Sequence, residues 1–274
     1  MKRRKQLAAA GINVLAWALS LVMLAPLLLI LFNSLKTGKA AADMRLSLPA
    51  SPEWSNYALV IEKGKLGTTF LNSMLYSACS VLLCTLLCTM AAYVLSRNRR
   101  KLHNFLYLFV VLGIAIPINY IPLIKVMQTL KLMNTRAGII LLYTATQIPF
   151  NVFLIHSFVS KISPEIDEAA VIDGASPLSL FFRIVMPLMK PVLVTVMVLT
   201  FLNTWSEFVM PLYFLGSTDK WPMTLAVYNF FGMYFKDWNL VCADIVLTSA
   251  PVVIIYLLGQ KYIVSGMTAG AVKG

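Results

Sequence analysis

Six apolar runs, separated by polar stretches, dominate the pattern of hydrophobic and polar positions along this chain of 274 residues. The runs cover roughly residues 12–32, 68–95, 102–124, 138–159, 191–215 and 242–262. Each has about 20 residues or more, enough for an α-helix to cross the roughly 30 Å hydrocarbon core of a bilayer. Because backbone polar groups in lipid must pair internally, such runs predict helices. The pattern therefore predicts an all-α integral membrane protein with six transmembrane helices.

Prolines interrupt several of these apolar runs. Pro117 and Pro122 fall in the third run, Pro149 in the fourth and Pro251 in the sixth. Because proline removes a backbone donor and clashes with the preceding turn, each predicts a kink. A kink in a spanning helix either borders a cavity or is a local bend without a functional role. The sequence leaves both interpretations of the third run open.

The polar stretch 163–191, between the fourth and fifth runs, has the pattern of two short helices separated by a glycine. Ser163 suits the N-cap of the first helix, with Pro164 at its first position, and Gly174 is a residue type that ends helices. Ser176 starts the second helix, and Pro187 is expected to end it. The first half holds four of the eleven acidic residues, namely Glu165, Asp167, Glu168 and Asp173. A helix–glycine–helix on a membrane face predicts a docking surface.

Composition agrees with a membrane protein and argues against several functions. The chain is 59% hydrophobic and only 12% charged, whereas soluble domains carry about 25% charge. The net charge of +12 fits loops that face anionic lipid, and no basic stripe interleaved with aromatic residues indicates nucleic-acid binding. The four cysteines show neither CxxC nor histidine-partner spacing, so no metal site or disulfide framework is expected. No P-loop, HExxH or GxSxG motif occurs, and therefore an enzyme is not expected.

The density of basic residues predicts the orientation in the membrane. Clusters at 2–5 and 97–101 lie close to helix ends, and such clusters mark the cytoplasmic side. Six spans then place both termini in the cytoplasm. The totals of Lys and Arg on the two sides barely differ, so the clusters decide the orientation. A cleavable signal peptide is the alternative interpretation of the first run, but about 21 apolar residues are enough to span, and a retained helix is expected.

The stretch 163–191 also resembles part of a known family. The matching positions are Glu168, Ala169, Ala170, Asp173, Gly174, Ala175, Phe181, Ile184, Pro187 and Pro191. Their spacing is similar to that of the EAA loop of ABC-importer permeases, with Met186 where the family usually has leucine. The resemblance implies that this loop is a coupling helix that binds in a cleft of a separate cytoplasmic ATPase. The residues expected to couple to the ATPase are Glu168, Ala169, Ala170, Asp173, Gly174 and Pro187.

Other parts of the sequence resemble the carbohydrate branch of this family. They are Asn-Ser-Leu-Lys at 33–36, Trp-Ser-Asn-Tyr at 54–57 and the glycine-containing ending at 260–274, which is similar to that of the six-span permease of maltose-type importers. The resemblance implies a multi-pass protein of the bacterial plasma (inner) membrane. It also implies three partners: a second permease subunit, an ATPase dimer and an extracytoplasmic sugar-binding protein. ATP and Mg would bind the ATPase, and no cofactor is expected in this chain.

These features divide the chain into three parts. Residues 1–67 hold the N-terminal tail, the first transmembrane helix and the first external loop. Residues 68–263 hold the transmembrane core, with five helices and the coupling loop 163–191. Residues 264–274 form a cytoplasmic C-terminal tail, which in the family reaches the interface of the ATPase dimer.

A polar cluster in the fifth run is a candidate for the translocation pathway. It contains Asn203, Trp205 and Glu207. Burying a carboxylate in lipid is costly, so Glu207 should face protein, water or substrate, or pair structurally with another helix. Trp205 offers a flat apolar face and one donor, which suits a sugar ring. The family often has asparagine at the position of Ser206, and in maltose-type importers the partner permease holds most sugar contacts.

The function expected from these features is that of a permease subunit in an ATP-driven, binding-protein-dependent sugar importer. It would form half of the translocation pathway and couple to the ATPase through the EAA loop. A permease for another solute, such as a polyamine or a peptide, is the alternative within transport. A stand-alone channel or a membrane enzyme is the alternative from another class. Flux without an ATPase partner would favour the channel, and a catalytic motif at a helix end would favour the enzyme.

Overall fold

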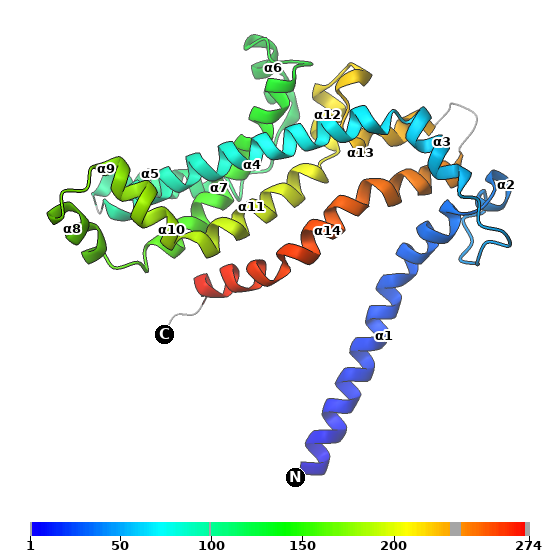
Figure 1. The fold of residues 1–274 in the computed structure, drawn as a ribbon, viewed down its shortest axis with the longest axis horizontal. Helices are drawn as coiled ribbons and strands as arrows, with labels where there is room; N and C mark the ends of the chain where they lie inside the picture. The colour runs from blue at the N-terminus through cyan, green and yellow to red at the C-terminus, as the bar shows by residue number, and fades with distance from the viewer. Residues whose placement is uncertain (1, 99, 231–236, 272–274) are drawn as a thin grey trace. The chain divides into compact units, whose positions relative to one another are not determined.

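The computed structural model describes the backbone of residues 2–98, 100–230 and 237–271, and the side chains within 11–98, 100–230 and 237–262. Every long regular element in these ranges is helical, and no strand occurs within them (Figure 1). This confirms the prediction of an all-α fold. The chain divides into two compact units, Met1–Thr69 with Leu225–Ala250, and Phe70–Thr224 with Pro251–Gly274.

The first unit contains a long apolar helix and the polar loop that follows it. Its elements are α1 (Lys2–Ser34), α2 (Gly38–Ala41), α3 (Ser55–Lys63), η3 (Val227–Phe230) and the N-terminal part of α14 (Trp238–Ala271). Large apolar side chains of α1 are exposed along most of the helix, from Ile12 to Leu31. An apolar helix that is not covered by its own chain is typical of a membrane span.

A buried polar network closes the loop after α1. The Nζ of Lys36, which is only 4% exposed, donates to Asn33 Oδ1 at 3.0 Å and to Ser47 Oγ at 3.1 Å. Asn56 Nδ2 donates to the carbonyl oxygen of Lys36 at 2.8 Å, and Asn56 Oδ1 accepts from Asn239 Nδ2 at 2.8 Å. The two sequence stretches at 33–36 and 54–57 therefore meet, and they hold the end of α1 against α3 and the start of α14.

The second unit is built around three helices that run alongside one another, α4, α7 and α11 (Figure 1). Its elements are α4 (Leu66–Arg97), α5 (Lys101–Leu112), α6 (Tyr120–Thr129), α7 (Arg136–Val159), α8 (Glu165–Ile172), α9 (Pro177–Ser179), η1 (Leu180–Val185), α10 (Met186–Leu188), α11 (Lys190–Trp205), α12 (Val209–Phe214), η2 (Thr218–Lys220) and α13 (Met223–Ala226). The helices α8, α9 and α10 gather at one end of it. The C-terminal part of α14 packs against α11, where Thr195 Oγ1 donates to the carbonyl oxygen of Tyr262 at 2.7 Å.

Buried apolar and polar side chains together hold this unit. One apolar cluster joins α4, α7, η1 and α11, and includes Cys88, Val152 and Val192. Inside it, Asn151 Nδ2 donates to Thr200 Oγ1 at 2.8 Å and lies 3.0 Å from Cys84 Sγ. Because lipid offers no hydrophobic drive between spanning helices, close packing and such cross-helix hydrogen bonds supply the association.

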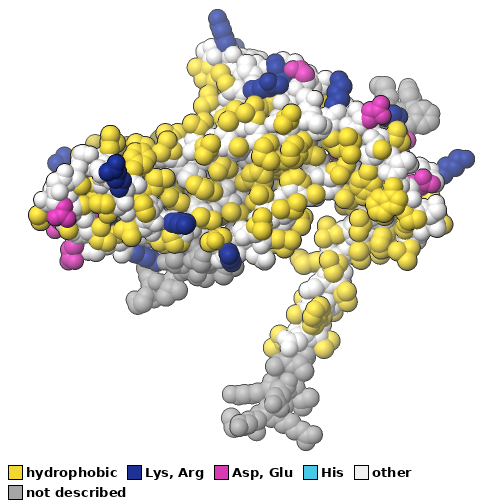
Figure 2. Space-filling view, viewed as in Figure 1, with side chains coloured by type: hydrophobic (Ala, Val, Ile, Leu, Met, Phe, Trp, Pro, Cys, Tyr) yellow, Lys and Arg dark blue, Asp and Glu magenta, His cyan; other side chains and the backbone are white. Residues whose placement is uncertain are grey.

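The apolar helices agree with a membrane protein but not with six uninterrupted spans. Among the described residues, four helices are long and apolar enough to cross a membrane: Gly11–Ser34, Leu66–Arg97, Arg136–Val159 and Trp238–Tyr262. A fifth span results if Pro177–Leu188 and Lys190–Trp205, which meet at a bend of 79°, are counted as one. Apolar side chains cover much of the visible face, and acidic side chains lie at the end that carries α8 (Figure 2). The helices α7 and α14 continue through Pro149 and Pro251.

The third and fifth apolar runs differ from the prediction of single helices. The third run forms α5, which ends at Leu112, and α6, which begins at Tyr120. Pro117 lies in the connection, and Asn119 starts α6 by accepting a hydrogen bond from the amide of Ile121 at 3.2 Å. The fifth run breaks between Trp205 and Val209. The connection between α5 and α6 lines a cavity, which favours the first of the two interpretations left open for these prolines.

Candidate functional site

The first half of the stretch 163–191 has the local structure that its sequence predicts. α8 begins at Glu165, one residue later than predicted, so Pro164 and not Ser163 occupies the N-cap position. The amide of Glu165 nevertheless donates to Ser163 Oγ at 3.3 Å. Three acidic residues in the first turn interact favourably with the positive end of the helix dipole. The helix ends at Ile172, and Gly174 has a φ of +80°, a backbone conformation that side chains rarely adopt. A break at this glycine is therefore built into the chain.

The second half is longer and less regular than predicted. Ser176 Oγ accepts from the amide of Ser179 at 3.3 Å and starts α9, as expected. The helical path then continues through η1, a π-helical segment, and through α10 as far as Leu188. Pro187 therefore does not end it, contrary to the prediction. Pro187 directly follows the π-helical segment, and the chain turns after Leu188 into α11.

The predicted coupling residues lie mostly on the surface of this end. Exposed members are Glu168, Ala169, Asp173, Gly174 and Pro187, whereas Ala170 is buried in the apolar cluster together with Phe181. Beside the acidic side chains, α8 exposes two large apolar ones, Val171 at 60% and Ile172 at 84%. α8 therefore shows an outer face that combines negative charge with uncovered apolar surface.

A partly buried ion pair attaches α8 to the end of α4. Asp167 Oδ2 accepts from Arg97 Nε at 2.8 Å and from the hydroxyl of Tyr93 at 2.8 Å. Asp167 Oδ1 accepts from Arg97 Nη2 at 3.2 Å, and Arg97 Nη1 donates to the carbonyl oxygen of Ile162 at 2.9 Å. The charged side chains are only 15% and 16% exposed. Of the acidic side chains of α8, Asp167 is thus held inward while Glu168 remains free to meet another surface.

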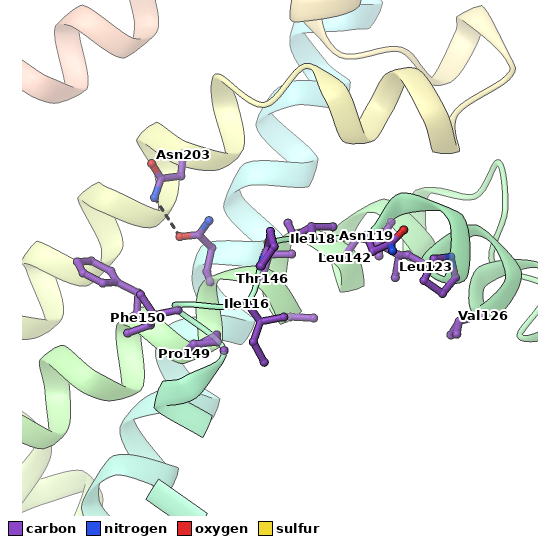
Figure 3. A pocket seen from close by; sticks show the side chains of 16 residues that line it. Ile116, Ile118, Asn119, Leu123, Val126, Leu142, Thr146, Pro149, Phe150 and Asn203 are labelled. Carbon is purple, nitrogen blue, oxygen red and sulfur yellow. Dashed lines mark hydrogen bonds between the residues drawn. The ribbon is translucent and has the colours of Figure 1, made fainter. Parts of the chain in front are cut away.

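A cavity of about 910 Å³ lies elsewhere in the same unit, between the α5–α6 connection, α6 and α7. Most of its lining is apolar, with Ile116, Ile118, Leu123 and Phe150 among the side chains in Figure 3. Its polar edge is formed by Asn203 of α11, whose Nδ2 donates to Gln147 Oε1 at 3.0 Å.

A second cavity, of about 560 Å³, shares this amide pair and has a more polar lining. It is bordered by Gln147, Asn203, Ser206 and Glu207, among others. The sequence left open whether Glu207 faces the pathway or pairs structurally with another helix. Glu207 Oε1 accepts from the amides of Val209 at 2.8 Å and Met210 at 3.0 Å, so the carboxylate caps the N-terminus of α12. This cap stabilises the start of α12.

Trp205, the third predicted pathway residue, is packed inside the unit. Its side chain is 1% exposed, stacks on Phe201 with ring centroids 5.3 Å apart, and meets Phe70 edge-on at 5.8 Å. In this conformation the indole presents no face to either cavity. Trp205 therefore supports the wall on which Asn203 lies.

Comparison with known proteins identifies the family. Residues 85–269 match the family described as the inner membrane component of binding-protein-dependent transport systems. The chain belongs to this family. The family is a membrane component of transport systems, so the chain is an integral membrane permease.

Relatives of this permease match it over most of their length. The multiple sugar-binding transport system permease protein MsmG of Streptococcus mutans is 33% identical, over 100% of both chains. The melibiose/raffinose/stachyose import permease protein MelC of Bacillus subtilis is 32% identical, over 96% of both chains. A solved crystal structure, of a bacterial ABC transporter involved in the import of the acidic polysaccharide alginate, has a TM-score of 0.84 at 24% identity. It covers 95% of this chain and 98% of that chain, which shows the shared fold.

Sequence reasoning missed two groups of residues in this permease. Tyr93 and Arg97 lie one helical turn apart at the end of an apolar run, and this spacing was a signal that they share one face of α4. Gln147 lies 56 positions before its partner Asn203, and no local pattern connects them. Among the described residues, no group of three or more His, Cys, Asp and Glu side chains is arranged as metal ligands would be.

Proposed function

We propose that the permease is a subunit of an ATP-driven, binding-protein-dependent sugar importer, and that α8 docks in a cleft of the ATPase. The outer face of α8 carries the proposal, because it combines exposed Glu168 with the uncovered apolar side chains of Val171 and Ile172. Uncovered apolar surface at a helix that is rimmed by charge is typical of a protein interface. The names of the relatives, with melibiose, raffinose and stachyose among the transported compounds, support sugars as the substrate class.

The proposed topology has six crossings with both termini in the cytoplasm. Four helices and the bent pair of Pro177–Leu188 with Lys190–Trp205 account for five crossings by length and composition. α5, an apolar helix of 12 residues, together with the connection to α6, forms the sixth. The predicted parts 1–67, 68–263 and 264–274 remain the proposed organisation, although the backbone of α14 is helical as far as Ala271. Residues 272–274 of the predicted tail lie outside the described residues.

The proposed partners are a second permease subunit, an ATPase dimer and an extracytoplasmic sugar-binding protein. ATP and Mg would bind the ATPase and not this chain. Closure of the ATPase dimer would move the cleft that holds α8, and α8 would pass this movement to the helices of the second unit. Exposed Ala169 allows close approach to the cleft, buried Ala170 packs α8 onto its own unit, and the glycine break sets the angle between α8 and the stretch that follows it.

The proposed pathway passes the amide pair of Gln147 and Asn203. Each amide offers both donors and an acceptor, which match the hydroxyl groups of a sugar. Ser206 adds a hydroxyl on the same cavity, whereas Glu207 is occupied with capping α12. The apolar lining of the larger cavity provides surface for the carbon face of a sugar ring.

The decisive experiment is reconstitution of the purified complex in liposomes, followed by ATP-dependent uptake of a panel of labelled sugars. Glu168→Lys is expected to abolish stimulated ATP hydrolysis and uptake, because it reverses the charge on the docking face. Glu62→Lys makes the same change on an exposed residue of α3, in the first unit, and serves as the control. If the permease purifies alone, or if Glu168→Lys transports sugar like the wild type, docking through α8 is wrong. Flux without any ATPase would favour a channel.

A further inference from the structure

The contact between α8 and α4 has the geometry of a rigid attachment. Arg97 donates three hydrogen bonds, two to Asp167 and one to the carbonyl oxygen of Ile162, in the segment that leads into α8. Both oxygens of Asp167 are used, and this two-point pairing fixes the orientation as well as the distance. The hydroxyl of Tyr93 adds a third donor to the same carboxylate. We call this set of Tyr93, Arg97, Asp167 and the Ile162 carbonyl the Arg97 clamp.

The surroundings of the Arg97 clamp make it stronger than a surface ion pair. Arg97 and Asp167 are 15% and 16% exposed, whereas the pair of Asp43 and Arg45 is 64% and 77% exposed. Water and salt weaken exposed pairs much more than partly buried ones. The ring of Tyr93 lies 5.8 Å from the guanidinium carbon of Arg97. The same ring packs against Phe181 of η1, with centroids 5.5 Å apart.

The Arg97 clamp also divides the surface of α8 into two faces. Asp167 and Ala170 point into the protein, whereas Glu168, Val171 and Ile172 stay uncovered. The uncovered face is therefore available to a partner without loss of any contact in the clamp. A force on that face reaches α4 through charged hydrogen bonds, and α4 is a helix of 32 residues that extends through the unit.

We propose that Tyr93, Arg97 and Asp167 are positioning residues that make α8 and the end of α4 move as one body, so that ATPase closure tilts α4. This inference rests on the proposed function of α8 as the docking helix. The new element is that the movement of α8 reaches the core through α4, which contacts α8 in space but lies far from it in the sequence. The covalent route is different, because the chain connects α8 to α7 through residues 160–164.

The test is a double-mutant cycle with Arg97→Gln, Asp167→Asn and both together, in the full complex. The first readout is hydrogen exchange of the α8 amides, and the second is ATP hydrolysed per sugar imported. Loss of hydrogen bonds to a charged group should speed α8 exchange by about tenfold or more in each single variant. In the double variant the α8 amides should exchange no faster than in the single variants, because both substitutions remove the same contact. Hydrolysis should continue while the ATP consumed per sugar rises severalfold.

Two controls and one milder variant complete the design. Arg100→Gln and Lys101→Gln remove exposed charges close to Arg97 in the sequence, outside α8, and should leave both readouts unchanged. Tyr93→Phe keeps the ring on Phe181 and should produce a smaller change in the same direction, even if the Arg97 variants fail to fold.

Unchanged α8 exchange in the single variants would overturn the proposal. Hydrolysis and uptake that fall in the same proportion would also overturn it, since that result indicates general damage. If the wild-type complex moves no sugar with ATP, the proposed function fails, and α8 exchange alone still decides whether the clamp holds α8.

Discussion

The end of the second unit that carries α8 and the cavity beside Asn203 use polar side chains in opposite ways. On α8, one acidic side chain is fully engaged inside the protein, and Glu168 is exposed on the outer face. At the cavity, one atom of each of three polar side chains already binds another side chain or the backbone. Gln147 accepts from Asn203, and Glu207 accepts from two amides of α12.

This difference has consequences for what each surface can bind. The outer face of α8 can accept a partner and keep all of its internal bonds, so binding there adds contacts. A ligand that takes the place of the Asn203–Gln147 hydrogen bond must exchange an existing bond for a new one, and the net gain of such an exchange is only about 1 kcal/mol. Strong, lasting docking is therefore expected at α8, and weak, reversible contacts at the cavity, as a pathway requires.

The largest expected effect comes from Ile172→Glu on α8. The isoleucine is 84% exposed, so the variant should fold normally. Binding to the ATPase should weaken by roughly 100-fold, because apolar burial is lost and an unpaired charge enters the interface. Affinity of the detergent-solubilised permease complex for its ATPase measures this. Leu178→Glu replaces a side chain that is 67% exposed and lies beyond the glycine break, and it shows whether the surface extends to α9.

Gly174→Val should have the next largest effect. A φ of +80° costs a β-branched residue about 1–2 kcal/mol. This cost should lower the population of the native backbone conformation at the break roughly tenfold. A Cβ at this position would meet no atom within 4 Å, so the cost comes from the backbone and not from a clash. Gly174→Asn is the matched control, because asparagine tolerates this conformation. Sugar imported per ATP should fall for valine and stay nearly normal for asparagine. Equal behaviour of the two variants would show that the break does not set the coupling angle.

The α8 end was largely predictable from the sequence because its signals are local. Ser176 caps α9, Ser163 accepts a hydrogen bond from an amide two residues further on, and the need for glycine at position 174 depends on its own φ. Pro187 is the exception. It follows a π-helical segment whose Phe181 and Val185 are buried in the core, and no local pattern in the sequence predicts that segment.

The cavity was predictable only in part, because it is formed by residues that lie far apart in the sequence and meet only in the folded protein. Asn203 was recognisable as a polar residue in an apolar run, but its partner Gln147 lies on α7 and the cavity wall comes from the α5–α6 connection. Trp205 follows Asn203 by two positions, and on a helix these residues face different directions. The helix therefore exposes Asn203 and buries Trp205, which composition alone does not reveal.

Asn203→Ala should raise the KM for sugar uptake by roughly threefold to tenfold, since one neutral hydrogen bond is lost. Gln147→Ala should act in the same direction, and the kcat of uptake should change less in both. Gln128→Ala removes an exposed amide from α6, outside the lining of either cavity, and should leave the KM unchanged. Wild-type KM values in both cavity variants would show that the amide pair only joins α7 to α11.

Glu207→Gln should have the smallest effect, and it is the sharpest test of the difference between the α8 end and the cavity. The amide oxygen of glutamine can still accept from the amides of Val209 and Met210, so the start of α12 should remain intact. Glu207→Ala removes the acceptor and should destabilise the complex by about 1 kcal/mol, the usual cost of a lost helix cap. Thermal unfolding of the purified complex compares the two variants.

Uptake kinetics then separate capping from a direct role of the charge. If Glu207 serves as a cap, glutamine should transport sugar nearly like the wild type, and alanine should lose uptake in proportion to its lower stability. If the carboxylate itself contacts the substrate, glutamine should raise the KM at unchanged stability. That result would show that the substrate makes a charged contact in the cavity. A charge-assisted hydrogen bond is roughly twice as strong as a neutral one. The cavity would then bind its ligand more strongly than expected, and it would no longer differ from the α8 end in this respect.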